Sequence, residues 1–590
     1  MKKTILYLLI VFAPFTQSCN SNKPHEEKPA NTEAADQAFA AFEDRFLDAY
    51  WKQYPSGAIY AGYGKYYDRM IVPDSTTFAS NILFSKSWLD SLEHISYNEL
   101  GENNKISLNI IKNQLESDHW YTTVFKSQEW DASMYNISGN CDYLINQPYA
   151  PLDTRLKTLS SYLENATSYY AAAVSNLNKP TKVHLELAIL QNEAGVSVLG
   201  TGLADSIKSS TLSEAEQQQL RKNIVLAVDA MKNYAKALKK INADKTIEFR
   251  DFRIGEKLFT EKFKYDLATD LTPAEVYAKA KADLKYHHNH MYAKADSVWS
   301  KYYKNEKKPS DSLQLIQMVL NKIQLDHATP EGFYDSINNQ VTALKKFIVE
   351  KDLFDIDTAT FPVKVRYMPE YARGVTTASA EFIPPYQKQG TTWYNIDDLT
   401  LYPKDKAESA LREENTYASQ ILSIHEAIPG HCLQGIYNIR KSPDVLRSVF
   451  QNGAMIEGWA VYCEDMMIEN GWGNHSAEIE LALGVWKLRE LANVIIDYDI
   501  QCRNVSEEEI TKLLHVDCFQ TSAQVQEKYH RATLSQVQLC SYYTGATAIK
   551  SLREEYKKKM GDSYSLKNFH ETFLSFGSSP VKYIRERMLK

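Results

Sequence analysis

The sequence predicts a mainly α-helical protein with one small β-sheet, and three regions of the chain lead to this prediction. From about Ala38 to Lys351, apolar residues recur at the three-and-four spacing of amphipathic helices. Between Phe361 and Ile396, alternating and β-branched residues are interspersed with glycine and proline, which is typical of short strands. After Asp405 the helical pattern returns and continues to the C-terminus.

The first residues have the layout of a secretory signal. Two lysines precede an apolar run from Ile5 to Phe15 that is too short to span a bilayer. Cys19 follows shortly after this run, as in bacterial lipoprotein signals, although Thr16 stands where leucine is more usual. The pattern favours a lipoprotein over a simply secreted protein.

The N-terminal pattern divides into two parts with different expected properties. We predict a lipoprotein signal peptide over residues 1–18, with lipidation at Cys19. The polar residues 19–37 then form a flexible tether. The lipid would anchor the protein to a membrane of the bacterial cell envelope, in the periplasm or on the outer-membrane surface.

Composition narrows the range of partners. A net charge of −7 over 590 residues gives no reason to expect nucleic acid. The 38 tyrosines indicate either an aromatic groove or aromatic packing between helices.

The long helical region carries local signals for the start of individual helices. Ser213 and Glu216 form a capping box ahead of an apolar stripe. Thr272 and Pro273 open a second helix with a cap and a proline at its first position. The stripe that follows Ser213 consists of Leu220, Ile224, Val228, Met231, Ala235, Leu238 and Ile241.

A metal-binding pattern stands at SIHEAIPGHCLQ, residues 423–434. His425 and His431 flank Glu426 as in a zinc hydrolase, but they are six residues apart rather than four. Pro429 cannot continue a regular helix, because it lacks an N–H group and its ring clashes with a carbonyl one turn back. Gly430 permits unusual backbone angles, so together they allow a bulge that returns His431 to the face of His425.

A second helix, MIEGWAVYCEDMMIENG at residues 455–471, supplies carboxylates. Glu457 and Glu464 are seven residues apart and therefore share one face. Glu457 is the candidate third ligand, which leaves Glu464 to hold a ligand histidine by its second ring nitrogen. The alternative is that both are solvated glutamates of an amphipathic helix, which the apolar neighbours Ile456 and Trp459 disfavour.

Other potential ligands show no such pattern. Six cysteines follow Cys19 without the paired spacing of a zinc knuckle, and they are either small buried residues or partners in disulfides. Three histidines share a predicted helix, but no carboxylate cluster follows them at ligand spacing, so a solvated face is expected. They are His287, His288 and His290.

The segments IHEAIPGHCLQ and EGWAVYCE resemble the bacterial family catalogued as domain of unknown function 885. Its members typically carry HEAxPGHHLQ and then EGWALYxE. The likeness extends to YPSGAIYAGYGKYYDR near the start, AEFIPPYQKQGTTWYN in the sheet region and LCSYYTG near the end. This family looks like a distant relative of helical zinc peptidases such as thimet oligopeptidase, angiotensin-converting enzyme and carboxypeptidase Taq.

The resemblance implies a fold of two helical halves flanking a deep channel, with a small β-sheet near the metal site. It covers a single domain over residues 38–588. We expect a helical half over 38–350, a sheet insertion over 351–400 and a helical catalytic half over 401–588.

Compared position by position, the resemblance implies one zinc ion held by His425, His431 and Glu457, with Glu426 as the catalytic glutamate. Tyr542 matches the tyrosine of the family's SYxxG element. The departures from the family pattern leave these residues in place. Cys432 replaces a second histidine, Gln536 stands where proline is common, and Asp499 and Gln501 replace a glycine and a histidine.

Substrate contacts are expected at two further places. Arg531, which matches an arginine ten to eleven residues before the SYxxG tyrosine, is positioned to bind a substrate carboxylate or to pair with Glu527. Residues Thr391 to Asn395 are expected to present an edge strand to a peptide backbone, with Tyr394 and Asn395 as contacts.

The predicted activity is zinc-dependent hydrolysis of peptide bonds in short peptides. Glu426 would take the proton of a zinc-bound water, and Tyr542 would donate a hydrogen bond to the oxyanion. A helical lipoprotein that binds glycans or peptides on aromatic surfaces, with a vestigial metal site, is the alternative, and it would not need converging ligands. A hydrolase of cell-wall amide bonds is not separable from a peptidase by sequence.

Overall fold

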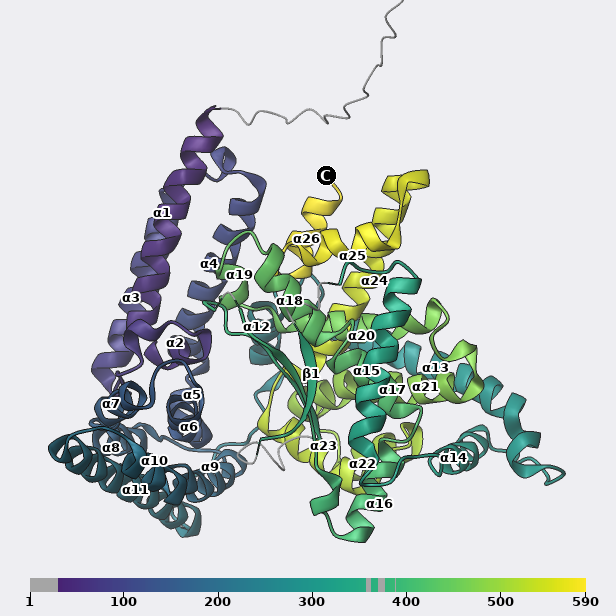
Figure 1. The fold of residues 1–590 in the computed structure, drawn as a ribbon, viewed down its shortest axis with the longest axis horizontal. Helices are drawn as coiled ribbons and strands as arrows, with labels where there is room; N and C mark the ends of the chain where they lie inside the picture. Colours follow the sequence, from purple (N-terminus) through teal and green to yellow (C-terminus); the bar gives the residue numbers. More distant parts are fainter. Residues whose placement is uncertain (1–29, 357–361, 370–376, 388) are drawn as a thin grey trace, which may run out of the picture.

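The computed structural model describes residues 30–356, 362–369, 377–387 and 389–590. Its helices gather into two bodies, which Figure 1 shows side by side. The N-terminal body comprises residues 30–243 and the C-terminal body residues 255–590. None of the helices described combines the length and the apolar character that a membrane span requires.

The N-terminal body consists of the helices α1 to α11. Its longest helix, α11, begins at the predicted capping box of Ser213 and Glu216, and residues of the predicted stripe such as Leu220 and Leu238 are buried in it. The elements are α1 (Ala30–Gln53), α2 (Pro55–Ala61), α3 (Ser75–Glu93), α4 (Glu102–Trp120), α5 (Ser127–Trp130), α6 (Ser138–Asn146), α7 (Leu152–Leu163), α8 (Ala166–Asn176), α9 (Lys182–Gly195), α10 (Thr201–Ser209) and α11 (Glu214–Ala243).

Helix α1 corrects the predicted tether. It begins at Ala30, so residues 30–37 are helical rather than extended chain. The reason is local, because the segment after Pro29 is rich in alanine and contains neither glycine nor proline until Pro55 is reached, just after the helix has ended. The predicted signal peptide and Cys19 lie outside the described residues.

The C-terminal body contains the remaining helices, including four that precede the sheet in sequence. These are α12 (Gly255–Leu267), α13 (Pro273–Tyr303), α14 (Ser312–Ile323) and α15 (Phe333–Glu350). After the sheet follow α16 (Lys404–Glu413), α17 (Ala418–Glu426), α18 (His431–Lys441), α19 (Leu446–Val449), α20 (Gly453–Glu469), α21 (Ala477–Tyr498), α22 (Glu507–Lys512), α23 (Ser522–Leu534), α24 (Ser541–Met560), α25 (Leu566–Leu574) and α26 (Val581–Met588).

Helix α13, which precedes the sheet in sequence, packs with a helix that follows it, while the predicted division of the chain at residue 350 stays a prediction. Helix α13 packs along α21, and Met291 and Trp299 share one buried cluster with Leu481 and Leu488. The apolar pattern of α13 shows that one face is buried, but it does not show which distant helix covers that face.

A three-stranded sheet occupies the predicted region. Its strands are β1 (Val363–Tyr367), β2 (Ala378–Glu381) and β3 (Thr392–Ile396), in the order β1-β3-β2. Strand β3 is parallel to β1 and antiparallel to β2. The prediction of an edge strand at 391–395 is therefore wrong, since β3 is the central strand and its backbone groups pair on both sides.

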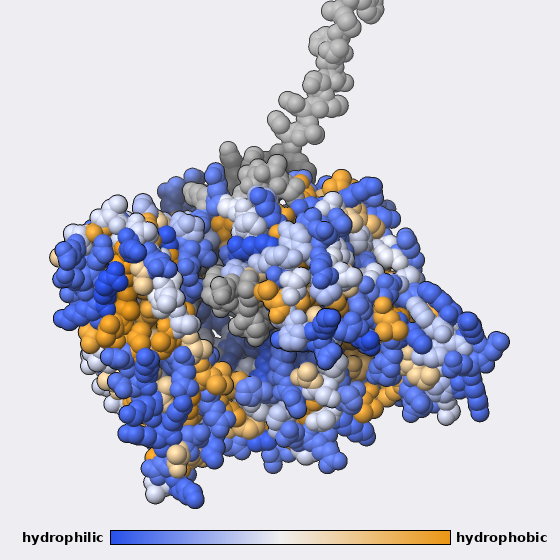
Figure 2. Space-filling model, turned by 60° about the horizontal axis from the view of Figure 1, so that its bottom comes forward, coloured by the Kyte–Doolittle hydropathy of each residue, from blue (hydrophilic) through white to orange (hydrophobic). Residues whose placement is uncertain are grey.

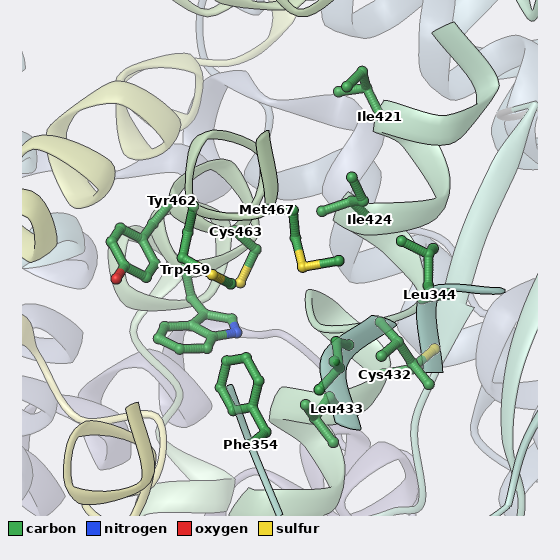
Figure 3. Close-up of a cluster of buried hydrophobic side chains, with 14 of the residues drawn as sticks. Leu344, Phe354, Ile421, Ile424, Cys432, Leu433, Trp459, Tyr462, Cys463 and Met467 are labelled. Atoms are coloured by element: carbon green, nitrogen blue, oxygen red, sulfur yellow. The ribbon is translucent and has the colours of Figure 1, made fainter. Parts of the chain in front are cut away.

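The sheet packs against α17 and α18, the two helices that carry the histidine pair. Below them, side chains from α15, α17, α18 and α20 converge in a buried cluster (Figure 3). Ile424 and Met467 belong to this cluster, and Trp459 packs with Phe354 at ring centroids 5.9 Å apart. This apolar support fixes the orientation of the helices from which the polar side chains project.

Helices α20 and α24 approach each other unusually closely at two glycines. A Cβ on Gly545 would lie 1.7 Å from the carbonyl oxygen of Ala454, and one on Gly458 would lie 2.3 Å from the Gly545 carbonyl carbon. Only glycine fits such an approach of two backbones. The contact brings Tyr542 of α24 toward Glu457 of α20.

Replacing Gly545 with alanine is expected to push α24 away from α20 and to lower the free energy of unfolding by about 2–3 kcal/mol. Denaturant titration measures this loss. Gly453→Ala is the matched control, because a Cβ there meets nothing within 4 Å. Alanine at that helical position should be neutral or stabilising by about 0.5 kcal/mol. Equal stability of the two variants would contradict this account of the crossing.

Candidate metal centre

The two histidines lie on consecutive helices rather than on one bulged helix. Helix α17 ends at Glu426, four residues follow, and α18 begins with His431. The N–H of Gly430 donates to the Ile424 carbonyl at 2.9 Å. A Cβ on Gly430 would lie 1.9 Å from the carbonyl oxygen of His425, so glycine is required for the chain to fold back this tightly.

The link between the helices is anchored from α20. The indole N–H of Trp459 donates to the Pro429 carbonyl at 3.0 Å, and both Trp459 and Pro429 are in the buried core of this body. Proline ends the hydrogen-bond ladder of α17, as its lack of an N–H predicts. The prediction that His425 and His431, six residues apart, place their rings on the same side is confirmed.

Three side chains converge at this point and could hold a metal ion. The imidazole rings of His425 and His431 have centroids 4.7 Å apart and are nearly perpendicular. Glu457 Oε2 lies 3.7 Å from His425 Nε2 and 3.5 Å from His431 Nε2. All three donor atoms lie within 4.8 Å of one another. Two ligands of one tetrahedral zinc, for comparison, are about 3.3 Å apart, so the three side chains are close enough to share one metal ion.

Glu464 orients His425, as predicted. His425 Nδ1 lies 2.7 Å from Glu464 Oε1, which leaves Nε2 free to face the other donors. Such a carboxylate fixes the tautomer of a metal ligand. Burial alone lowers the pKa of His425, but the carboxylates of Glu457 and Glu464 outweigh burial and raise it. The site therefore has an anionic environment that suits a cation.

A buried lysine, which the sequence analysis missed, supports Glu464. Lys487 Nζ lies 3.0 Å from Glu464 Oε2, 3.0 Å from Asp465 Oδ2 and 3.2 Å from Glu490 Oε1. Burial alone would raise the pKa of Glu464, but Lys487 and His425 lower it, so this carboxyl stays ionised. The available signal was a lysine among apolar neighbours in α21, where an exposed position was not expected.

Tyr542 and Arg531 also lie at the site. The ring of Tyr542 stacks beside His425 with centroids 6.5 Å apart. Arg531 is exposed, and its Nη2 donates to Gln538 Oε1 at 2.8 Å and lies 3.5 Å from the Tyr542 hydroxyl. Within the described part of the chain, Arg531 does not form the ion pair with Glu527 that was its alternative role.

Glu426 stands at the C-terminal end of α17, directly after His425. Its side chain is half-buried. Among the described residues, its carboxylate forms no hydrogen bond or ion pair with protein groups, unlike that of Glu464. Its carboxylate is thus free to act on a bound molecule.

Tyr394 and Asn395 do not take the predicted positions at a strand edge. Tyr394 is wholly buried in the central strand. Asn395 is held inside the sheet, where its Oδ1 accepts from Arg366 Nε at 2.7 Å and its Nδ2 donates to Ser379 at 3.3 Å. Sequence alternation identified the strand but not its place in the sheet order.

Other potential ligands are used elsewhere. His288 Nε2 lies 2.6 Å from the Asp517 carbonyl, and His290 faces Glu480. The six cysteines in the described part of the chain are unpaired, and five are buried, which agrees with their reading as small core residues. Cys432, which replaces a family histidine, packs beside β3 with its Sγ 3.9 Å from the Trp393 carbonyl.

The fold and the site define a mainly helical protein with a small mixed sheet and a His-His-Glu group that could hold a metal ion. The chain belongs to the family described as "Bacterial protein of unknown function (DUF885)", whose sequence profile matches residues 55–588. No protein with a curated description matches it.

Two solved structures are similar to nearly the whole chain. One is described as a "putative lipoprotein of unknown function" from Shewanella oneidensis, with 39% identity and a TM-score of 0.85, covering 94% of this chain and 100% of its own. The other is a "putative lipoprotein" from Colwellia psychrerythraea, with 15% identity and a TM-score of 0.75, covering 94% and 98%. The second likeness shows the fold alone.

Lys487→Met is expected to destabilise the protein by about 3–5 kcal/mol, because it leaves the buried carboxylate of Glu464 without its lysine partner, whereas Asp465 keeps its ion pair with Lys550. Metal affinity should fall at least tenfold, since Glu464 would no longer be held against His425. Denaturant titration and competition with a chelator measure the two effects. The exposed Lys285→Met is the control and should change stability by less than about 0.5 kcal/mol. A Lys487→Met protein as stable as this control would contradict the role of the network.

Proposed function

We propose that this protein is a zinc-dependent hydrolase of peptide bonds that acts on short peptides. The observation that carries the proposal is the convergence of His425, His431 and Glu457 beside the uncommitted carboxylate of Glu426. Two imidazoles and a carboxylate are a typical donor set of catalytic zinc, and three protein ligands leave one position open. Zinc bound here supplies a Lewis acid for the scissile carbonyl and for a water molecule.

The proposed chemistry uses the residues around this group in separate roles. Glu426 accepts the proton of the attacking water and passes it to the leaving amine. The Tyr542 hydroxyl donates a hydrogen bond to the oxyanion that forms at the former carbonyl. The exposed guanidinium of Arg531, next to Tyr542, binds a carboxylate of the peptide.

Access between the two bodies supports a peptide substrate. In the space-filling view the surface is hollowed where the N-terminal and C-terminal bodies meet (Figure 2). A cavity of about 660 Å³ lies in this region, and its lining includes Tyr60 of α2 and Phe382 of the segment after β2. A recess of this kind admits a short chain more readily than a folded protein.

The proposed place of action is the cell envelope, with the protein anchored by a lipid on Cys19. The layout of the first residues supports this, and the similar structure from Shewanella oneidensis is described as a "putative lipoprotein". The folded protein then lies outside the cytoplasm, where short peptides from protein or cell-wall turnover are available.

Glu426→Gln is expected to retain one zinc ion per chain but to lose at least about 99% of peptide hydrolysis, since an amide cannot accept the proton of water. Mass spectrometry of the metal and a screen of free and blocked peptides measure the two quantities.

His431→Ala is the comparison variant and should lose zinc as well as activity, because two protein ligands remain. His94→Ala, far from the site and exposed, should change neither. Hydrolysis by Glu426→Gln at the wild-type rate would exclude Glu426 as the base and favour a binding lipoprotein with a vestigial site.

Tyr542→Phe is expected to keep zinc and substrate binding, while kcat falls by about a hundredfold, because only the hydrogen bond to the oxyanion is lost. Steady-state kinetics on one cleaved peptide separate kcat from KM. A rise in KM at unchanged kcat would instead assign Tyr542 to substrate binding.

A further inference from the structure

The cavity of about 660 Å³ lies between the two bodies and borders the candidate metal centre. Its wall is built from α2 and α6 of the N-terminal body and from residues 381–387 of the C-terminal body. Phe382 belongs to this wall, and its ring centroid lies 6.4 Å from that of His431. Its ring also packs so tightly on α18 that a Cβ on Gly435 would lie 2.6 Å from Phe382 Cδ1. One aromatic ring therefore separates the cavity from a proposed metal ligand.

The charged groups in this wall are acidic. Among the described lining residues, Asp142 and Glu381 are the charged ones. Glu381 is neutralised by an ion pair with Arg366. Asp142 is half-buried, and its described partner is the neutral amide of Asn146 at 2.7 Å. Burial raises the pKa of Asp142, which is the effect expected of a carboxylate that lacks a cation.

Three tyrosines line the same cavity as Asp142. The rings of Tyr60 and Tyr143 meet edge to face at 6.0 Å, and those of Tyr143 and Tyr149 stack at 6.2 Å. The hydroxyl of Tyr149 is buried and, within the described part of the chain, has no hydrogen-bond partner. Aromatic faces attract cations, and the combination with an unpaired carboxylate is favourable for an alkylammonium group.

We propose that this cavity binds an alkylammonium group of the peptide, either its free N-terminus or a lysine-type side chain, with Asp142 as the counter-ion and the tyrosines around it. This inference rests on the proposed peptide hydrolysis and names its preferred substrates. The volume of the cavity lies within the ~300–1,000 Å³ of small-ligand sites, so the cavity takes several residues on one side of the cleaved bond.

The arrangement also gives the bound peptide a direction. The cavity adjoins the metal centre on the side of His431, through Phe382. Arg531 adjoins it on the side of His425, through Tyr542. The peptide would thus place its cationic part toward Asp142 and its carboxylate toward Arg531.

Binding of four pentapeptides to the zinc-loaded Glu426→Gln variant tests this proposal without turnover. The peptides share one sequence and combine a free or acetylated N-terminus with lysine or norleucine at the second position. Isothermal titration calorimetry gives each Kd. We expect at least one ammonium-bearing peptide to bind about tenfold more tightly than the acetylated norleucine peptide, since an ion pair with hydrogen bonds contributes on this scale. The preferred peptide identifies the source of the ammonium group.

Substitutions in the same Glu426→Gln background identify the counter-ion. Adding Asp142→Asn should abolish the preference, while Asp142→Glu should keep most of it. Asp205→Asn, an exposed carboxylate of α10 outside the cavity, should leave it unchanged. Equal affinities for all four peptides, or an undiminished preference in a folded Asp142→Asn protein, would overturn the proposal.

These binding measurements distinguish a failure of the proposed ammonium site from a failure of the proposed reaction. Charge-selective binding by a protein that cleaves no peptide would contradict hydrolysis and retain the binding site. Hydrolysis of charged and neutral peptides alike, together with equal Kd values, would contradict the binding site and retain hydrolysis.

Discussion

The buried ion pair between Lys487 and Glu464 underlies the candidate metal centre, because it keeps a carboxylate ionised where burial alone would favour the neutral acid. Ionised Glu464 accepts from His425 Nδ1 and so directs Nε2 toward Glu457 and His431. Burying several charges is costly, and a purely structural core would be as stable with apolar side chains. Keeping this network is easier to explain by the orientation of His425 than by stability.

Two close backbone approaches bring the remaining groups to the same point. Gly430 lets α18 begin directly over the end of α17, and Gly458 with Gly545 lets α24 cross α20 almost in contact. The first approach places His431 beside His425, and the second places Tyr542 beside His425. The site thus combines four helices, α17, α18, α20 and α24, whose close approaches depend on glycines, while its electrostatics are set by charged side chains on α20 and α21.

The sequence predicted those parts of the molecule that depend on local pattern. Capping boxes, apolar stripes and the helix break at Pro429 are determined by neighbouring residues. The helices and the approach of the two histidines could therefore be predicted from the sequence. Glu457 and Glu464 followed from helical periodicity. Lys487, the central place of β3 and the union of α13 with α21 depend on partners far along the chain. A single sequence does not show which helix faces or strands pack against each other when they lie far apart in the chain. The wrong placement of Tyr394 and Asn395 at a sheet edge has the same cause.

The charges around the site are arranged with opposite sign on its two sides. Arg531 stands beside Tyr542, and Asp142 lies in the cavity behind Phe382. A short peptide in its free form carries a cation at one end and an anion at the other, so this arrangement would favour one direction of binding. Direction would matter for the proposed hydrolysis, in which Glu426 faces the attacking water and Tyr542 the oxyanion. Asp142 belongs to the N-terminal body and Arg531 to the C-terminal body, so a bound peptide would contact both, and their relative position becomes part of the site.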